Sequence, residues 1–431
     1  VQGLGSAEIT VGIHIAAPGL ALQPGGAIDQ VGRSRLSTVY MPGHKITMLP
    51  DEVVQAYTLS EGRNCPALSI YFSLDETTLE LRSFETRIER VPIVANLRHD
   101  QLDAVITEAS LTAQERGEAP AGYPFATELA FLFRLARHLK AQRELARGKP
   151  ENFNRPDYSF KLEGLTGAEP DGSETVLIGE RKRGAPLDLI VAEAMILANS
   201  RWGGWLAECG VPGIYRSQAS LLPGIKVRMG VKPLPHAGMG VAQYSWATSP
   251  LRRYVDLANQ WQLVACARHG KTAALAAPFK PKDAALFSVI SGFDAAYSAY
   301  NGFQNSLERW WTLRHLEQAG IAELDATVLK DGLVRAETLP LVFRALGCES
   351  LPRGARVRVR ITGSDLLTLD LHASLLARID DAGATAGNAD VDAEEAEEAA
   401  EAAAPLALAI DLQDAEPGAQ NTTGSDSPTA V

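Results

Sequence analysis

The chain has 431 residues, of which 46% are hydrophobic and 22% charged, so it is long enough for two or three domains and has an ordinary soluble composition. Its four cysteines are far apart and form no CxxC pair, which excludes a zinc site or a disulfide framework of the usual spacing. The net charge of −11 comes from the carboxyl-terminal end, because residues 381–431 hold twelve acidic residues and no Lys or Arg. No apolar run approaches the roughly 20 residues that span a bilayer, so we expect no membrane segment. The cysteine pattern indicates reduced thiols, so we expect a cytoplasmic protein.

The first hundred residues predict an antiparallel sheet. Residues 8–16 alternate between apolar and polar side chains, and residues 66–74 and 83–91 alternate like a second pair of strands. His14 lies in the first of these strands. A lone histidine in such a strand is more often a core or supporting residue than a catalyst.

A short helix is predicted over residues 29–38, followed by a loop. Pro42 and Gly43 stop any regular element there and leave Tyr40 near the loop. An aromatic ring in this position can stack on a nucleic-acid base, or it can pack in the core. The sequence alone leaves both interpretations open.

The middle of the chain is helical. Apolar residues at i, i+3 and i+4 predict helices over residues 100–111, 125–147, 186–209 and 284–316. Basic residues end the second helix, among them Arg143, and such a run is usually a solvated face. In the third helix Glu193 stands alone in an apolar run, so it needs a partner: an arginine, a ribose hydroxyl or a metal-bound water.

The stretch from Trp246 to Gln260 has the residues of an anion site. Thr248 or Ser249 suits a helix N-cap and Pro250 the first helical position, which would put Arg252 and Arg253 in the first turn. Cations there oppose the helix dipole unless an anion is bound, and a guanidinium beside free N–H groups suits a phosphodiester. The alternative is that Arg253, or less readily Arg252, pairs with Asp256 on the same helix.

The last part of the chain predicts a small barrel and an acidic tail. Short strands are expected over residues 325–329, 333–336, 355–361 and 366–371, with hairpin turns at 330–332 and 363–365. Arg356, Arg358 and Arg360 would share one strand face, which is either the solvent side or a grip on phosphates. Residues 381–431 lack a core pattern and are expected to be disordered.

Several of these motifs together resemble one family. The sequence Tyr-Ser-Trp-Ala-Thr-Ser-Pro-Leu-Arg-Arg-Tyr-Val-Asp at 244–256 resembles the signature of the RNB family, the ribonuclease II and ribonuclease R exoribonucleases. Further segments agree in the expected order, at residues 11–16, 40–43, 48–50, 155–158 and 191–199. The resemblance spans roughly residues 8 to 317.

The resemblance implies an α+β fold in three parts. Residues 1–320 would form an RNB catalytic domain, with an antiparallel sheet surrounded by helices. Residues 321–380 would form an OB-type RNA-binding barrel, and residues 381–431 the acidic tail. Such a protein would be a bacterial, monomeric enzyme that hydrolyses single-stranded RNA from its 3′ end, releasing nucleoside 5′-monophosphates with Mg²⁺.

Site residues follow from the same resemblance, position by position. The catalytic motif would be Arg252, with Arg253 and Tyr254 beside it. The residues that would bind RNA are Tyr40 and Phe153 by base stacking, Glu193 near the terminal nucleotide, Ser249, and His99, which stands where relatives often have tyrosine.

One departure divides the functional hypotheses. The family's magnesium-binding aspartates lie just upstream of the strand at 8–16, whereas residues 1–28 contain only Glu8 as an acid, and Ala17 stands where relatives commonly have aspartate. The chain also begins with Val1 rather than Met. We therefore expect the metal ligands upstream of Val1, in an exoribonuclease of which this is an incomplete, inactive portion. The alternative is a non-catalytic RNA-binding protein of the same fold.

Overall fold

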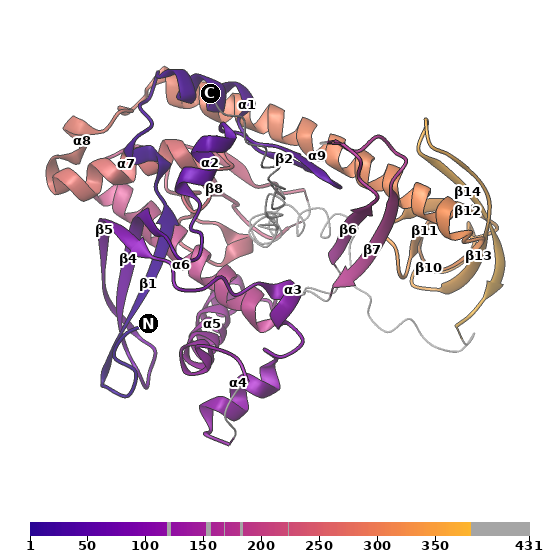
Figure 1. The fold of residues 1–431 in the computed structure, drawn as a ribbon, viewed down its shortest axis with the longest axis horizontal. Coiled ribbons are helices and arrows are strands. Elements are labelled where there is room, and N and C mark those ends of the chain that lie inside the picture. Colours follow the sequence, from indigo (N-terminus) through magenta and orange to yellow (C-terminus); the bar gives the residue numbers. More distant parts are fainter. Residues whose placement is uncertain (119–121, 152–156, 168, 182–183, 223, 381–431) are drawn as a thin grey trace, which may run out of the picture.

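The computed structural model describes residues 1–118, 122–151, 157–167, 169–181, 184–222 and 224–380, except for the side chains of residues 99, 100 and 181. The fold is α+β, as expected: a body of helices and a sheet, with a small barrel at the far end of one long helix (Figure 1). Within these residues no helix is both long and apolar enough to cross a membrane. The tail predicted over residues 381–431 lies outside the described part.

The predicted sheet is present, and its strands run in the order β1-β4-β5, all antiparallel. They are β1 (Glu8–Ala16), β4 (Asn64–Asp75) and β5 (Leu81–Pro92). Alternate residues of β1 and β4, such as Ile9 and Ile70, join a buried cluster with Phe131 and Trp202 from the helices. Burial of one strand face explains the alternation in the sequence.

Three of the four predicted long helices are confirmed, namely α5 (Ala126–Arg147), α6 (Pro186–Glu208) and α9 (Ala284–Ala319). The fourth is wrong, because residues 100–111 are divided between α3 (His99–Leu102) and α4 (Glu108–Glu115). Thr107 Oγ1 accepts a hydrogen bond from the Ser110 N–H at 3.1 Å, and Ser110 Oγ accepts one from the Thr107 N–H at 3.0 Å. This capping box begins a new helix.

Small elements connect β1 to β4. They are η1 (Pro18–Leu20), α1 (Ala27–Arg35), β2 (Val39–Met41), β3 (His44–Ile46) and α2 (Asp51–Tyr57). Tyr40 lies in β2, next to the predicted turn. Pro42 and Gly43 end β2 as expected and form the turn of the β2–β3 hairpin, with Gly43 at a positive φ of 72°.

A second hairpin, β6 (Asp157–Glu163) and β7 (Thr175–Arg181), lies against α9. The Gln318 side chain of α9 accepts a hydrogen bond from the Val176 N–H at 3.1 Å and donates one to the Glu174 carbonyl at 2.7 Å. Ile178 packs against the core of the barrel. The hairpin thus connects the long helix with the barrel.

The segment between α6 and α9 crosses the centre of the body. Its elements are β8 (Tyr215–Ser217), β9 (Arg228–Gly230), η2 (Ala237–Met239), α7 (Tyr254–His269), η3 (Gly270–Thr272) and α8 (Ala273–Ala276). Helix α7 is buried on all sides along most of its length.

The predicted small barrel is closed by five strands in the order β10-β11-β12-β14-β13. They are β10 (Glu323–Lys330), β11 (Leu333–Ala336), β12 (Val342–Leu346), β13 (Arg356–Asp365) and β14 (Asp370–Arg378). Strand β12 was not predicted. The second hairpin turn, predicted at residues 363–365, lies at 366–369 instead. Asp365 pairs with Asp370, and the Asp365 carboxylate accepts a hydrogen bond from the Leu367 N–H at 2.7 Å.

Candidate functional site

The site is built where helix α7 begins. The helix starts at Tyr254, and Arg253 precedes it in an extended conformation with φ −133° and ψ 125°. The Tyr254 N–H donates to the Leu36 carbonyl at 2.8 Å, and the Thr38 N–H donates to the Arg252 carbonyl at 2.9 Å. The predicted start, four residues earlier, is wrong because these contacts hold the backbone in a strand-like bridge.

Arg253 is held by Asp256, as in the alternative interpretation of the sequence. Arg253 Nε donates to Asp256 Oδ2 and Nη2 donates to Oδ1, both at 2.7 Å, and the Ser249 N–H donates to the same Oδ1 at 2.8 Å. Both side chains are almost completely buried. Burial lowers the pKa of Arg253, but the Asp256 carboxylate outweighs it, so the pKa is raised and the guanidinium is charged.

Arg252 has a different environment from its neighbour. It is only 8% exposed, and its Nη2 has no hydrogen-bond partner among the described residues. Burial first, and then the adjacent Arg253 charge, lowers the pKa of Arg252 to about 10. The guanidinium is still protonated at neutral pH, so it is a buried cation whose charge the surrounding residues compensate incompletely.

Two guanidinium groups contact the aromatic ring of Trp246. The guanidinium carbons of Arg253 and Arg216 lie 4.0 Å and 4.1 Å from the ring centroid of Trp246, and the ring of Tyr297 is 6.2 Å away. The Arg253 Nη1 and Trp246 Nε1 atoms are also buried without a partner in the described part of the chain.

The sequence alone assigns no role to Arg216, Trp246 or Tyr297. For Arg216 a signal is available, because an arginine in a short buried strand requires a partner. Trp246 falls within the family motif, but nothing in the motif separates an unpaired indole from a packed one. Nothing marks Tyr297, which lies within a long helix.

Two buried asparagines fix the backbone of the motif. The Asn199 Oδ1 atom accepts a hydrogen bond from the Ala247 N–H at 2.9 Å. Asn259 Nδ2 donates to the carbonyls of Trp246 and Ile214, both at 2.8 Å, and its Oδ1 accepts the Ile214 N–H at 2.7 Å. The loop that carries Trp246 is thus bound to α6 and α7.

The other motif residues lie around Arg252. Tyr40 lies near Arg252, where its hydroxyl contributes to the electrostatic environment of that guanidinium, as does Tyr297. Tyr254 is 1% exposed, and its hydroxyl donates to Asp29 Oδ1 at 2.5 Å. Its observed role is therefore to join α7 to α1, and its catalytic role stays a prediction.

Glu193 has an arginine partner. Arg143 donates to both of its carboxylate oxygens, from Nε to Oε2 at 2.9 Å and from Nη2 to Oε1. Arg143 also binds Glu151 Oε1 at 2.8 Å and the Met239 carbonyl at 2.9 Å. Arg143 is therefore buried instead of solvated as predicted. Burial raises the pKa of Glu193, and the Arg143 contacts oppose that shift.

Two predicted RNA-binding residues cannot be placed beside this site. Phe153 lies outside the described residues. His99 begins α3, but its side chain lies outside the described part. Both assignments stay predictions.

The residues near Arg252 do not fit a magnesium ion. Mg²⁺ needs several oxygen ligands, whereas the Asp256 carboxylate binds Arg253 and Ser249, and Asp29 accepts bonds from the Tyr254 hydroxyl and, at 2.6 Å, from the Gly25 N–H. Across the described part of the chain, no group of three or more His, Cys, Asp and Glu side chains could hold a metal ion.

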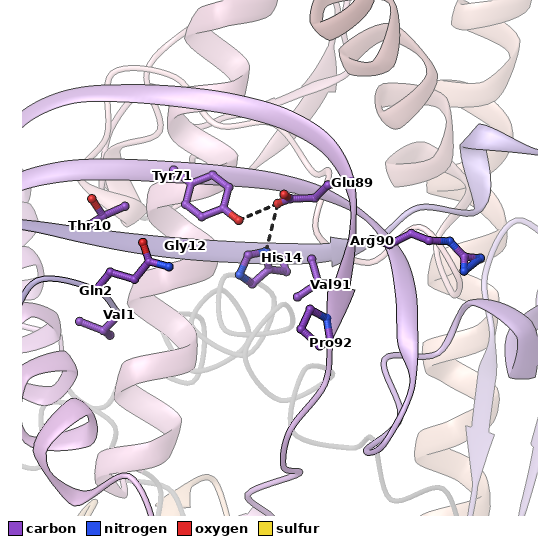
Figure 2. A pocket seen from close by; sticks show the side chains of 10 residues that line it. All are labelled: Val1, Gln2, Thr10, Gly12, His14, Tyr71, Glu89, Arg90, Val91 and Pro92. Atoms are coloured by element: carbon purple, nitrogen blue, oxygen red, sulfur yellow. Dashed lines mark hydrogen bonds and ion pairs between the residues drawn. The ribbon is translucent and has the colours of Figure 1, made fainter.

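A separate polar cluster lies on the outer face of the sheet, beside a pocket of about 220 Å³ (Figure 2). His14 Nδ1 is 2.8 Å from Ser69 Oγ and 3.9 Å from Glu89 Oε1, and the Tyr71 hydroxyl donates to Glu89 at 2.7 Å. Burial lowers the pKa of His14. No residue of the 244–256 motif lines this pocket.

The arginine stripe on the barrel is paired with carboxylates. Arg356 binds Glu337 at 2.7 Å, Arg358 binds Asp325 at 2.7 Å, and Arg360 binds Glu323 at 3.2 Å. All three pairs are exposed. Of the two interpretations of the stripe, this arrangement favours the solvent side.

Comparison with known proteins identifies the class of this fold and motif. The RNB domain model matches residues 1–223 and 225–269, so the chain belongs to the RNB domain family. An uncharacterised ribonuclease of Synechocystis is 27% identical over 82% of this chain and 53% of its own length. Exoribonuclease 2 of Vibrio parahaemolyticus is 25% identical over 60% of this chain and 44% of its own. The chain thus spans about half the length of these relatives.

Solved structures share the fold. RNase R of Mycoplasma genitalium, in complex with ribose-methylated single-stranded RNA, has a TM-score of 0.68 at 13% identity, covering 85% of this chain and 67% of that one. Yeast Ssd1, which is a pseudonuclease, has a TM-score of 0.58 at 15% identity over 84% of this chain and 50% of that one. The same fold therefore occurs in a ribonuclease and in a pseudonuclease.

Proposed function

We propose that this chain binds the phosphates of single-stranded RNA in a 3′-to-5′ exoribonuclease that releases nucleoside 5′-monophosphates. One observation carries the proposal: Arg252 is a buried, protonated guanidinium whose Nη2 has no partner in the described part of the chain, beside an Arg253 that is already neutralised by Asp256. A phosphate oxygen would supply the missing partner and charge. The family and its named relatives support RNA as the source of that phosphate.

The chain's own residues would orient the RNA. Arg252 would bind the phosphate, the Asp256 pair would hold the motif backbone, and Tyr40, which acts electrostatically on Arg252, would stack on a neighbouring base. Hydrolysis in this family would use Mg²⁺ to activate water. The described residues do not fit that ion. The monomeric state and cytoplasmic location stay parts of the proposal, motivated by resemblance and by the cysteine pattern.

The alternative is an RNA-binding protein without hydrolytic activity. It is favoured by Ala17, whose side chain is fully buried and whose N–H donates to the Pro66 carbonyl at 3.1 Å, at a position where the family resemblance implies aspartate. The fold shared with the Ssd1 pseudonuclease agrees with it.

A cleavage assay separates the two functions. Single-stranded RNA of about 20 nucleotides, labelled at its 5′ end, is incubated with the protein in Mg²⁺ or in EDTA, while binding is measured on the same samples. Stepwise shortening from the 3′ end in Mg²⁺ alone supports the exoribonuclease. Tight binding without shortening supports the alternative, and the absence of binding contradicts both. Arg252→Ala is the control for a contaminating nuclease, which it would leave unchanged.

A further inference from the structure

We propose that the indole N–H of Trp246 donates a hydrogen bond to the same phosphate that Arg252 binds, so the inference rests on the proposed function. Trp246 is 2% exposed, and its Nε1 is unpaired among the described residues. A buried N–H without an acceptor costs free energy, so its retention calls for an acceptor other than the residues that the structure describes.

Two other buried tryptophans show the usual arrangement. Trp202 Nε1 donates to Thr86 Oγ1 at 3.1 Å, and Trp261 Nε1 donates to the Leu22 carbonyl at 2.8 Å. Both side chains are as buried as Trp246. A buried tryptophan in this fold can therefore find a hydrogen-bond acceptor for its indole N–H. Trp246 differs, because no described residue accepts a hydrogen bond from its indole N–H.

The Trp246 ring contacts an arginine that also carries an unpaired donor. The Arg253 guanidinium carbon lies 4.0 Å from the centroid of the Trp246 ring, so Arg253 Nη1 and the indole N–H belong to side chains in contact. Tyr297 is near this ring and contributes to the electrostatic environment of both Arg252 and Arg253. Together with Arg252 Nη2, the motif thus has three buried N–H donors that no described residue satisfies.

An anion satisfies these donors better than water does. The Asp256 carboxylate near them already accepts bonds from Arg253 and Ser249, so the remaining donors face an excess of positive charge. Water would accept a bond but would not offset that charge, whereas a phosphodiester presents two oxygens that share one negative charge. The chemical class is therefore an RNA phosphate, and free inorganic phosphate is the competing source.

The indole proton can be observed directly. Protein with ¹⁵N-labelled tryptophan is titrated in EDTA with a short 2′-O-methyl RNA, and separately with inorganic phosphate. The Trp246 resonance, assigned by its loss in Trp246→Phe and by contacts with the Phe293 ring, should move downfield and saturate with RNA binding. The Trp202 and Trp261 resonances should stay in place, because their N–H groups are already bonded.

Affinity provides the second measurement. Trp246→Phe keeps a ring beside Arg253 but removes the N–H, and it should weaken RNA binding about tenfold, as expected for a hydrogen bond to an anion. The matched Trp202→Phe loses a satisfied N–H, so it should lower the melting temperature without changing RNA affinity.

The outcomes separate the two proposals. If RNA saturates the protein and Arg252→Ala weakens binding, but the Trp246 resonance does not move, the role of Trp246 is overturned and the proposed function stands. A shift with inorganic phosphate but not with RNA also overturns it, because the site then belongs to a free anion. If RNA does not bind the wild type at all, the proposed function fails first.

Discussion

Arg252 and Arg253 have identical side chains but different partners. Arg253 makes two 2.7 Å bonds to Asp256, which offset its charge, whereas Arg252 has no such carboxylate partner among the described residues, where its Nη2 is unpaired and its pKa is lowered. The structure therefore assigns maintenance of the fold to one residue and leaves the other available to an anion. We expect substitutions in the Arg253–Asp256 pair to lower stability and substitutions of Arg252 to lower RNA affinity.

Asp256→Asn tests the structural half of this division. It leaves the Arg253 charge buried without its carboxylate, so we expect a loss of about 3–5 kcal/mol in unfolding free energy, measured by urea denaturation. Asp325→Asn is the matched control, since it breaks an arginine–carboxylate pair on the exposed barrel surface and should cost under about 1 kcal/mol. Equal losses in both variants would show that Asp256 does not hold a buried charge.

His236 should make the fold sensitive to acid. Its Nδ1 accepts the Met239 N–H at 3.2 Å, and burial, followed by the Arg216 charge, lowers its pKa to about 3. The unfolded chain takes up this proton near pH 6.5 and the folded chain does not, so stability is complete above pH 6.5. It falls by roughly 1.4 kcal/mol per pH unit as the pH decreases from there toward 3.

The measurement is a set of urea midpoints between pH 7 and pH 4. His236→Asn retains an acceptor but cannot take up a proton. The slope of its unfolding free energy against pH should therefore correspond to about one proton fewer than the slope of the wild type. Parallel curves for the two proteins would mean that His236 is protonated in the folded state.

At the scale of elements, helix α7 acts as a clamp, in that its side-chain amides bind the backbone of neighbouring loops. Asn259 binds backbone groups of Ile214 and Trp246, and Gln260 binds backbone groups of Ala16 and Gly19. The side-chain amides satisfy loop backbone groups that would otherwise be buried without partners. These bonds keep the site backbone in place.

Asn259→Ala should therefore affect both stability and binding. It removes three hydrogen bonds and leaves their backbone partners buried, so we expect a loss of about 3 kcal/mol, with weaker RNA binding because the Trp246 carbonyl is released. Gln262→Ala is the control. It also loses three bonds, to Pro212 and Phe279, and should cost similar stability without a comparable loss of affinity. Unchanged RNA affinity in Asn259→Ala would contradict the link between clamp and site.

The same elements show what could be predicted from sequence. Strand β1 was predicted with its observed bounds because one of its faces is buried, which imposes alternation. The start of α7 was predicted wrongly, because it is set by contacts with residues 36–38, which are more than 200 positions away in the chain. Strand β12 was missed because Val342 and Leu346 are apolar but exposed, so its sequence does not alternate. Arg252 followed from the motif, whereas an unpaired atom such as Trp246 Nε1 requires coordinates.

On the scale of the whole molecule, α9 connects the site to the barrel (Figure 1). Tyr297 of this helix lies beside Trp246, and the Gln304 side chain accepts a bond from the Tyr40 N–H at 3.2 Å. Further along the same helix, Arg309 donates to the carbonyls of Leu369 and Val342 in the barrel, at 2.7 and 2.9 Å. Residues of one helix therefore contact both the site and the barrel.

The barrel arginines should contribute little to RNA binding. Because Arg356, Arg358 and Arg360 are paired with carboxylates, replacing all three by Ala should change affinity for single-stranded RNA by less than about threefold at 0.15 M salt. Fluorescence anisotropy measures this directly. A loss of a hundredfold would show that RNA displaces the carboxylates and that the stripe grips phosphates.

The most direct test of the central claim is the salt dependence of RNA affinity in Arg252→Ala. If Arg252 contacts one phosphate, its removal should weaken binding and reduce the slope of log K against log salt by about 0.7, while Arg252→Lys should keep the slope but regain only part of the affinity. Arg358→Ala should match the wild type. An Arg252→Ala protein that folds, binds RNA with wild-type affinity and shows the wild-type slope would contradict the account.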